Sequence, residues 1–253
     1  MSDPIAPEIA LAATPGPGLT RGQERVIAVL EALLCSSLPT QILIAGVLNA
    51  IGLSALTPAA QLSLPFVLVL SIADSVLLIM LMVVLMRMHG DSPRDLWRGH
   101  RPLAREAIVG LGLVPVAVLM VGVVLGSLRE FAPWLHNVPT NPLEALAEGG
   151  TVDAAMFGVI AIVAGGIREE LQRAFLLQRF ERHLGGAAVG VVVLSTLFGL
   201  GHLTQGWDAV VATGVLGAFW AVVYLRRRSI VAPIISHAGF NSIEVFRVAI
   251  GAP

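Results

Sequence analysis

The residues best suited to chemistry lie in the second half of the chain, in three short groups. They read REELQR over 168–173, FGLGH over 198–202 and HAGFN over 237–241. Each group places a carboxylate, an imidazole or a carboxamide within an apolar stretch. An ionisable side chain inside a membrane segment costs about 2.5 to 3.5 kcal/mol unless it is paired or faces a cavity, so its presence favours a functional site.

Helical spacing assigns these side chains to faces. Glu169 and Arg173 stand four residues apart, so they can form an ion pair on one helical face, whereas Glu170 points about 100° away. His237 and Asn241 are also four apart, and this spacing predicts that they share one site. The spacing therefore predicts two functional faces on two different helices.

The residue types match peptide hydrolysis, which needs an activated water, a stabilised oxyanion and a proton for the leaving amine. We expect Glu169 and His202 to polarise the water. His237 and Asn241 would donate hydrogen bonds to the oxyanion, and Arg173 would orient the carboxylate. Glu170 is the second choice for the base.

Three other interpretations stay open at this point. Glu169, His202 and His237 with an open fourth position match the ligand set of a catalytic zinc ion, although the sequence has no HExxH motif. The same three residues could form the relay of a proton-coupled transporter, although no inverted repeat is present. A catalytically inactive membrane scaffold is the third interpretation.

The elements that position these groups must cross a membrane. Of the 253 residues, 56% are hydrophobic and 13% are charged, and the mean hydropathy is +0.83. No Asp, Glu, Lys, Arg or His lies between Glu31 and Asp74, a stretch long enough to cross a hydrocarbon core of about 30 Å twice. We predict an all-α, polytopic transmembrane bundle of seven to eight spans, with seven at 26–51, 63–86, 107–128, 154–178, 187–205, 209–225 and 229–250.

The arginines predict the orientation of these spans, because short cytoplasmic loops are enriched in basic residues. Every basic residue counted as Lys or Arg is an arginine, and most fall on one side of a seven-span topology. We therefore expect a cytoplasmic N-terminus in a multi-pass protein of the bacterial inner membrane. The expected divisions are a disordered cytoplasmic tail over 1–20, N-terminal membrane helices over 21–150 with a basic cytoplasmic loop over 87–106, and a catalytic core over 151–250.

Depth in the bilayer agrees with a shared site. Counted from the expected cytoplasmic ends at 1.5 Å per residue, Glu169 lies about 20 Å deep, His202 about 24 Å and His237 about 12 Å. Membrane lipid is an expected partner. A net charge of −1 without a long basic run argues against nucleic acid. The sequence does not predict the oligomeric state.

At these three groups the sequence resembles the CPBP family, which contains the type II CAAX prenyl endopeptidases and the Abi group of bacteriocin-immunity proteins. The resemblance covers roughly residues 150 to 245. The family's Phe-xxx-His motif is present at Phe198 and His202, and its His-xxx-Asn motif at His237 and Asn241.

The family's Glu-Glu-xxx-Arg motif is irregular here, because only two residues separate Glu170 from Arg173. Aligning the glutamates leaves Ala174 at the arginine position, and aligning the arginine leaves Arg168 at the first glutamate position. Glu169 is a motif glutamate in both alignments. The resemblance implies an intramembrane endopeptidase acting on a membrane-delivered peptide or a lipidated protein, which we expect to enter from the lipid or from the cytoplasmic face.

Overall fold

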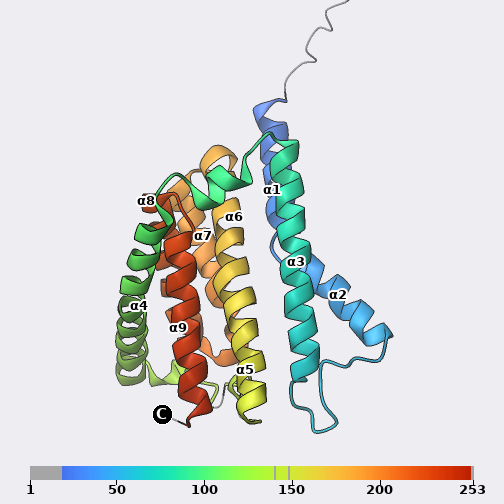
Figure 1. Ribbon diagram of the computed structural model, residues 1–253, viewed down its shortest axis with the longest axis vertical. Helices are drawn as coiled ribbons and strands as arrows, with labels where there is room; N and C mark the ends of the chain where they lie inside the picture. The colour runs from blue at the N-terminus through green and yellow to red at the C-terminus, as the bar shows by residue number, and fades with distance from the viewer. Residues whose placement is uncertain (1–18, 140, 148, 252–253) are drawn as a thin grey trace, which may run out of the picture.

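The computed structural model describes residues 19–139, 141–147 and 149–251, so most of the expected tail over 1–20 lies outside the described residues. Within the described ranges the chain consists of helices and connecting loops, with one isolated antiparallel bridge between Leu56 and Leu62. The longer helices run up and down in one bundle (Figure 1). The all-α class predicted from the sequence is confirmed.

Most of the helices are α-helical, and short 3₁₀ or π segments (η) lie between or within them. The segments are α1 (Arg21–Leu34), α2 (Leu38–Ala50), α3 (Leu64–Met88), η1 (Arg94–Arg98), α4 (Leu103–Phe131), η2 (Pro133–Leu135), η3 (Glu144–Leu146), α5 (Thr151–Ile160), η4 (Ala161–Arg168), α6 (Glu169–His183), α7 (Ala187–Leu200), η5 (Leu203–Gln205), α8 (Trp207–Arg227) and α9 (Val231–Ala249).

Five helical stretches of the described residues are long and apolar enough to cross a membrane. They are Arg21–Ala50, Leu64–Met88, Leu103–Phe131, Thr151–His183 and Trp207–Arg227. Helix α7 has only 14 residues, and α9 is more polar because the site residues lie on it. Both pack inside the same bundle, and the expected seven to eight spans remain a prediction beyond these five.

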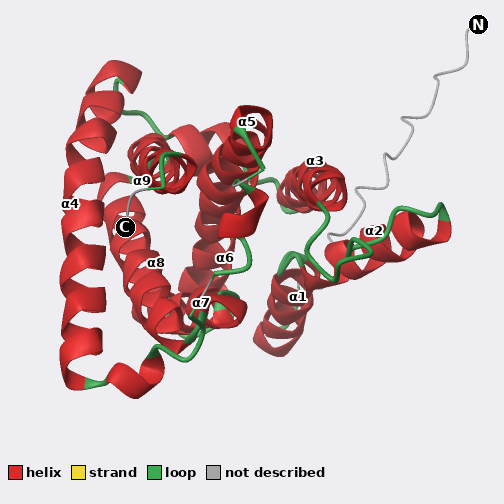
Figure 2. Cartoon of the chain, turned by 90° about the horizontal axis from the view of Figure 1, so that it is seen from below, coloured by secondary structure: helices red, strands yellow, loops and turns green. Residues whose placement is uncertain are grey.

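The first predicted span, 26–51, corresponds to the candidate span Arg21–Ala50, which a break divides into α1 and α2. Ser37 adopts a left-handed conformation with φ of 69°, and α2 begins immediately after it with a proline in its first turn. Pro39 lacks an N–H, and in a continuous helix its ring would clash with the carbonyl of Cys35 four residues earlier, so the α-helix does not continue through this point. Helix α2 consequently diverges from the bundle, and Figures 1 and 2 both show it pointing away from α6 and α8.

The bundle has one end that is rich in arginine. Helix α3 ends there, α4 and α9 begin there, and η1 crosses this end between α3 and α4 (Figure 1). Arg227 donates two hydrogen bonds of 2.6 Å to the fully buried Glu106. Arg228 makes a similar pair with Glu181 at 2.7 Å. The arginines expected to mark topology therefore also fasten the helix ends together.

A second charged cluster joins α1 and α6 to the end of α3. Arg179 donates to Glu31 at 2.6 Å and to Asp91 at 3.0 Å, and Arg182 donates to Asp91 at 2.6 Å. Burial raises the pKa of Asp91, but the hydrogen bonds from Arg182 and Arg179 outweigh it, so the pKa lies below its ordinary value of 3.8. Asp91 is therefore ionised at neutral pH and stabilises this end of the bundle.

Replacing Asp91 with asparagine is expected to lower the free energy of unfolding by about 1 to 3 kcal/mol at neutral pH, because charge-assisted hydrogen bonds to two arginines are lost. A carboxyl with a depressed pKa contributes stability above its unfolded pKa and loses it as the pH falls through the folded pKa. The difference from wild type should therefore shrink below about pH 4. Thermal unfolding in detergent at several pH values measures it, with the exposed Asp95→Asn as the control. A difference that grew on acidification would contradict this assignment.

Candidate active site

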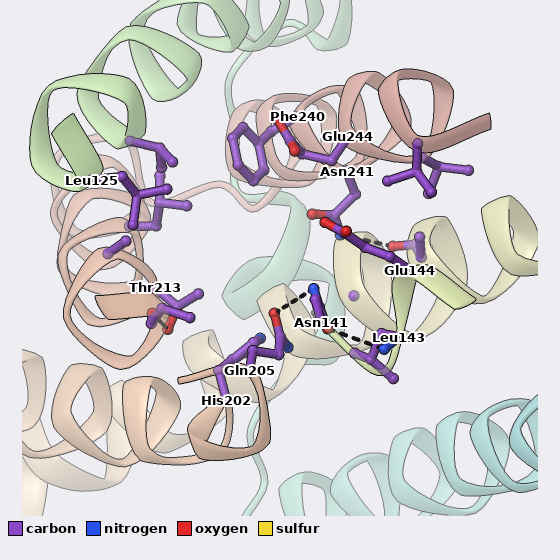
Figure 3. Close-up of a pocket in the computed structure, with 18 of the residues that line it drawn as sticks. Leu125, Asn141, Leu143, Glu144, His202, Gln205, Thr213, Phe240, Asn241 and Glu244 are labelled. Atoms are coloured by element: carbon purple, nitrogen blue, oxygen red, sulfur yellow. Dashed lines mark hydrogen bonds between the residues drawn. The ribbon is translucent and has the colours of Figure 1, made fainter. Parts of the chain in front are cut away.

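The predicted site residues gather around one cavity of about 520 Å³ between α4, α5, α6, α8 and α9. Glu169, His202, His237 and Asn241 all line it. Figure 3 shows His202 and Asn241 on opposite walls, with Thr213 and Phe240 on the helices beside them. Three sequence groups separated by tens of residues thus share one cavity.

The two neighbouring glutamates of α6 face different surroundings. Glu169 lines the cavity and its side chain is 20% exposed. The Glu170 side chain is 1% exposed and is not among the residues that line the cavity. It accepts hydrogen bonds from Arg173 and from Nδ1 of His237, the latter at 2.8 Å. Glu169 is therefore the motif carboxylate that a bound molecule can reach.

The expected ion pair between Glu169 and Arg173 is wrong, because Arg173 pairs with Glu170 instead. Residues three and four apart are both neighbours on a helix, and the position of His237 on α9 places the buried negative charge at Glu170. Arg168, the other arginine of the motif, donates to Ser37 and Gln172 at 2.9 Å each. It connects α6 to the break between α1 and α2.

His202 presents one defined ring nitrogen to the site. Its Nδ1 lies 2.8 Å from the carbonyl oxygen of Phe198, and because a carbonyl only accepts, Nδ1 carries the proton. In the neutral ring Nε2 is then the acceptor. The Phe198 ring packs edge-on against both histidines, with centroids 4.9 Å from His202 and 6.1 Å from His237. The Phe-xxx-His spacing therefore fixes both the tautomer and the position of the imidazole.

His237 is held on three sides. The Trp220 ring stacks on it with a centroid separation of 3.7 Å and an interplanar angle of 16°. Its Nδ1 donates to Glu170, and its Nε2 lies 3.8 Å from a carboxylate oxygen of Glu169. Trp220 in turn donates to Ser236 at 3.2 Å. The imidazole therefore has little freedom to rotate, and its Nε2 faces the cavity carboxylate.

A π-helical segment immediately precedes Glu169. Asn241 donates to the carbonyl oxygen of Ala161 at 2.9 Å, at the start of η4. A Cβ on Gly165 would lie 2.5 Å from the Asn241 amide nitrogen, and one on Gly166 would lie 2.7 Å from Ala238. The glycine pair therefore allows α9 to approach η4 closely. π-helical turns recur at functional sites, and the sequence pattern did not predict this one.

The described residues do not fit the expected metal site. No group of three or more His, Cys, Asp or Glu side chains among them is placed to hold a metal ion. His237 donates from Nδ1 to Glu170, and its Nε2 lies 3.8 Å from a carboxylate oxygen of Glu169.

Sequence reasoning missed the polar residues at the mouth of the cavity. His136 pairs with Asp208 at 2.8 Å, and Asn141 donates to Gln205 at 3.3 Å (Figure 3). These residues belong to the segment between α4 and α5, to η5 and to the start of α8, and the first of these is far from the other two in the sequence. Nothing in the spacing within either segment signals the pairs. Trp220, within an apolar run, also gave no signal.

Comparison with known proteins supports the same region. Residues 151–243 match the family described as type II CAAX prenyl endopeptidase Rce1-like. No curated protein and no solved structure matches the chain. The resemblance noted over residues 150 to 245 is confirmed, and the matched residues contain α5 to α8 and most of α9, which line the cavity together with α4. The chain is thus a helical membrane protein whose residues 151–243 match the type II CAAX prenyl endopeptidase Rce1-like family.

Proposed function

We propose that this chain is an intramembrane endopeptidase that hydrolyses a peptide bond of a membrane-delivered or lipidated substrate. The observation that carries the proposal is the cavity itself, which brings Glu169, His202, His237 and Asn241 together inside an apolar bundle. The family match supports protease chemistry. Membership of a protease family and a cavity with hydrolytic side chains point to the same reaction class.

In the proposed reaction, Glu169 and His202 activate a water molecule. The Glu169 carboxylate takes a proton from the water, and Nε2 of His202 accepts the hydrogen bond of the second water hydrogen. The water oxygen then forms a bond to the carbonyl carbon of the scissile peptide. General base catalysis of this kind contributes about 10²- to 10⁴-fold to a rate.

The oxyanion formed on the carbonyl oxygen needs hydrogen-bond donors. Asn241 uses one amide hydrogen on Ala161 and has a second for the oxyanion. His237 can donate from Nε2 when both of its ring nitrogens are protonated. The proton on Glu169 then passes to the departing amine as the carbon–nitrogen bond breaks. Donors fixed before the reaction are the largest single contribution in many acyl-transfer enzymes.

Glu170 and Arg173 act in this proposal as positioning residues. Their ion pair lies behind His237, and Arg173 also lies over the Phe198 ring, 4.9 Å from its centroid. Glu170 thereby fixes the His237 ring, and Arg173 supports both Glu170 and the aromatic ring between the two histidines. The irregular spacing of the motif leaves this buried pair intact.

The direct test is cleavage of a quenched fluorescent prenylated peptide by purified protein in detergent, followed by mass spectrometry of the products. Wild type should cleave it, and His202→Ala should lose most of the activity. Glu130→Gln, an exposed carboxylate at the end of α4, is the matched control and should cleave like wild type. Equal cleavage by all three proteins would contradict the proposal.

Chelation tests the zinc interpretation separately. Because the described donors do not converge on a metal position, we expect cleavage to continue after prolonged treatment with a strong chelator. Rates measured before and after chelation, and after adding zinc back, provide the comparison. A loss of activity that zinc restores would return Glu169, His202 and His237 to the role of metal ligands.

Substituting alanine for Gly166 is expected to separate α9 from the catalytic glutamate. The added methyl group would lie 2.7 Å from Ala238 Cβ and 2.9 Å from its Cα, so the backbone of α9 must move. Small misplacements of catalytic groups cost about 10²-fold in rate. We expect kcat for the peptide to fall by that order. Gly112→Ala, where a Cβ meets nothing within 4 Å, should leave kcat unchanged, and equal effects of the two would contradict the argument.

A further inference from the structure

The catalytic cavity becomes more exposed toward one end of the bundle. Along α9 its lining residues pass from the buried His237 through Asn241 to Glu244, whose side chain is 38% exposed. Along α4 they pass from Val121 to the exposed Arg129. On both helices the exposure of the lining residues increases toward the C-terminal end. The cavity therefore opens where α4 and α9 end and where α5 and α8 begin (Figure 1).

The other end of the bundle is closed by η1 and the residues after it. Trp97 donates to the carbonyl oxygen of Leu171 at 3.1 Å and accepts from the backbone N–H of Ile230 at 2.8 Å. Tyr224 donates to the Leu96 carbonyl oxygen at 3.0 Å. Among the described residues that line the cavity, none lies in 87–106 or 226–231. The arginine-rich end therefore offers no route to Glu169.

Charge decides which side of the membrane each end faces. The closed end carries the arginines of the α3–α4 connection, of the end of α6 and of the α8–α9 connection; these are Arg87, Arg94, Arg98, Arg101, Arg105, Arg179, Arg182, Arg226, Arg227 and Arg228. Short loops with such an excess of arginine stay in the cytoplasm. The open end has far fewer arginines. The connection between α4 and α5 at that end, over residues 132–150, contains no arginine or lysine.

From the exposure of the cavity and the placement of the arginines together, we infer that the active site opens to the non-cytoplasmic side of the membrane. Resting on the endopeptidase function proposed above, the inference also names the substrate class: a polypeptide segment exposed on that side. The sequence alone had led us to expect entry from the lipid or from the cytoplasmic face. A lipidated C-terminus that stays in the cytoplasm would not reach Glu169.

The mouth is suited to a hydrated peptide rather than to a bare acyl chain. Arg247 pairs with Glu144 and with Glu244 at 3.0 Å each, and His136 pairs with Asp208 at 2.8 Å. Figure 3 shows Glu144, Glu244 and Asn241 together at this side of the cavity. A rim of charged and amide groups offers donors and acceptors to a peptide backbone. Acyl chains gain nothing from such a rim, because their burial is driven by apolar contact.

Cysteine accessibility tests the direction of opening without any need for activity. The chain has a single cysteine, the buried Cys35, so Cys35→Ala provides a background without thiols. On it, Pro139→Cys reports the mouth, Thr213→Cys reports the cavity wall, and His100→Cys reports the arginine-rich end. Each variant is treated with a membrane-impermeant maleimide in intact bacterial cells, in inverted vesicles and in detergent.

We expect Pro139→Cys and Thr213→Cys to be labelled in intact cells, and His100→Cys to be labelled only in inverted vesicles or detergent. The reverse pattern would overturn the inference. Labelling of Thr213→Cys in detergent but from neither side of the sealed membrane would also overturn it, because no open path would exist.

Cleavage of a peptide supplied on one side of the membrane at a time tests from which side the substrate reaches the active site. Intact spheroplasts should cleave an impermeant quenched peptide in the medium, whereas sealed inverted vesicles should cleave it only after permeabilisation. Cleavage by sealed inverted vesicles alone would overturn the inference. Failure of the proposed function is distinguishable, because no preparation would then cleave the peptide while the labelling pattern would still report the direction of opening.

Discussion

Glu169→Gln is expected to lower kcat for peptide cleavage by about 10²- to 10⁴-fold while leaving the protein folded. Glutamine keeps the size and the hydrogen-bonding capacity of the side chain but cannot take a proton from water. Glu169 lines the cavity and is partly exposed, and its contact with Arg168 is long, at 3.6 Å, so its neutralisation removes no short ion pair. The measurement is the initial rate of cleavage together with thermal unfolding of the same preparation.

Glu170→Gln is the informative companion variant, because the two glutamates are neighbours in sequence and differ in environment. We expect it to destabilise the protein and to lower the rate indirectly, through the loss of the charge that orients His237. A variant Glu169→Gln with the activity of wild type would contradict the assignment. If ion flux in proteoliposomes, rather than cleavage, disappeared in Glu169→Gln, the transporter interpretation would replace the protease. An intact cellular phenotype for Glu169→Gln would favour the scaffold.

Arg173→Met is expected to cause the largest loss of stability among single substitutions in the site, about 3 to 5 kcal/mol, because breaking a buried ion pair leaves an uncompensated charge. Arg173 and Glu170 are both buried, and Arg173 also packs over Phe198 and Trp220. Methionine fills similar apolar volume without the charge. Unfolding by heat or by SDS in mixed micelles measures the effect.

The double variant Glu170→Gln with Arg173→Met separates charge from packing. If the cost comes from the unpaired carboxylate, neutralising Glu170 should recover most of the lost stability. The exposed Arg105→Met is the control and should stay within about 0.5 kcal/mol of wild type. A double variant less stable than Arg173→Met alone would show that the charge is not the source of the loss.

Much of the fold follows from hydropathy, because membrane helices must satisfy their backbone hydrogen bonds internally and therefore appear as long apolar runs. The break between α1 and α2 escaped this pattern, since serine, leucine and proline around Ser37 do not interrupt an apolar average. The π-helical segment before Glu169 escaped as well. Its sequence, AIVAGGIR, has no feature that separates it from an ordinary helix apart from the glycine pair.

The site itself was largely visible in the spacing, and its internal pairing was not. Residues four apart on one helix, such as His237 and Asn241, must share a face, and both line the cavity. The partner of Arg173 depended on where α9 lies, which no local pattern encodes. The side from which the cavity opens depended on exposure along α4 and α9, and this property exists only in the folded bundle.

The central claim is that water activated by Glu169 hydrolyses a peptide bond in this cavity. The most direct measurement is mass spectrometry of the products after incubating purified wild type and Glu169→Gln with peptide in water labelled with heavy oxygen. The account predicts one heavy oxygen in the new C-terminal carboxylate of the wild-type product and no product from Glu169→Gln within the same time. Labelled product formed equally by both proteins would contradict it.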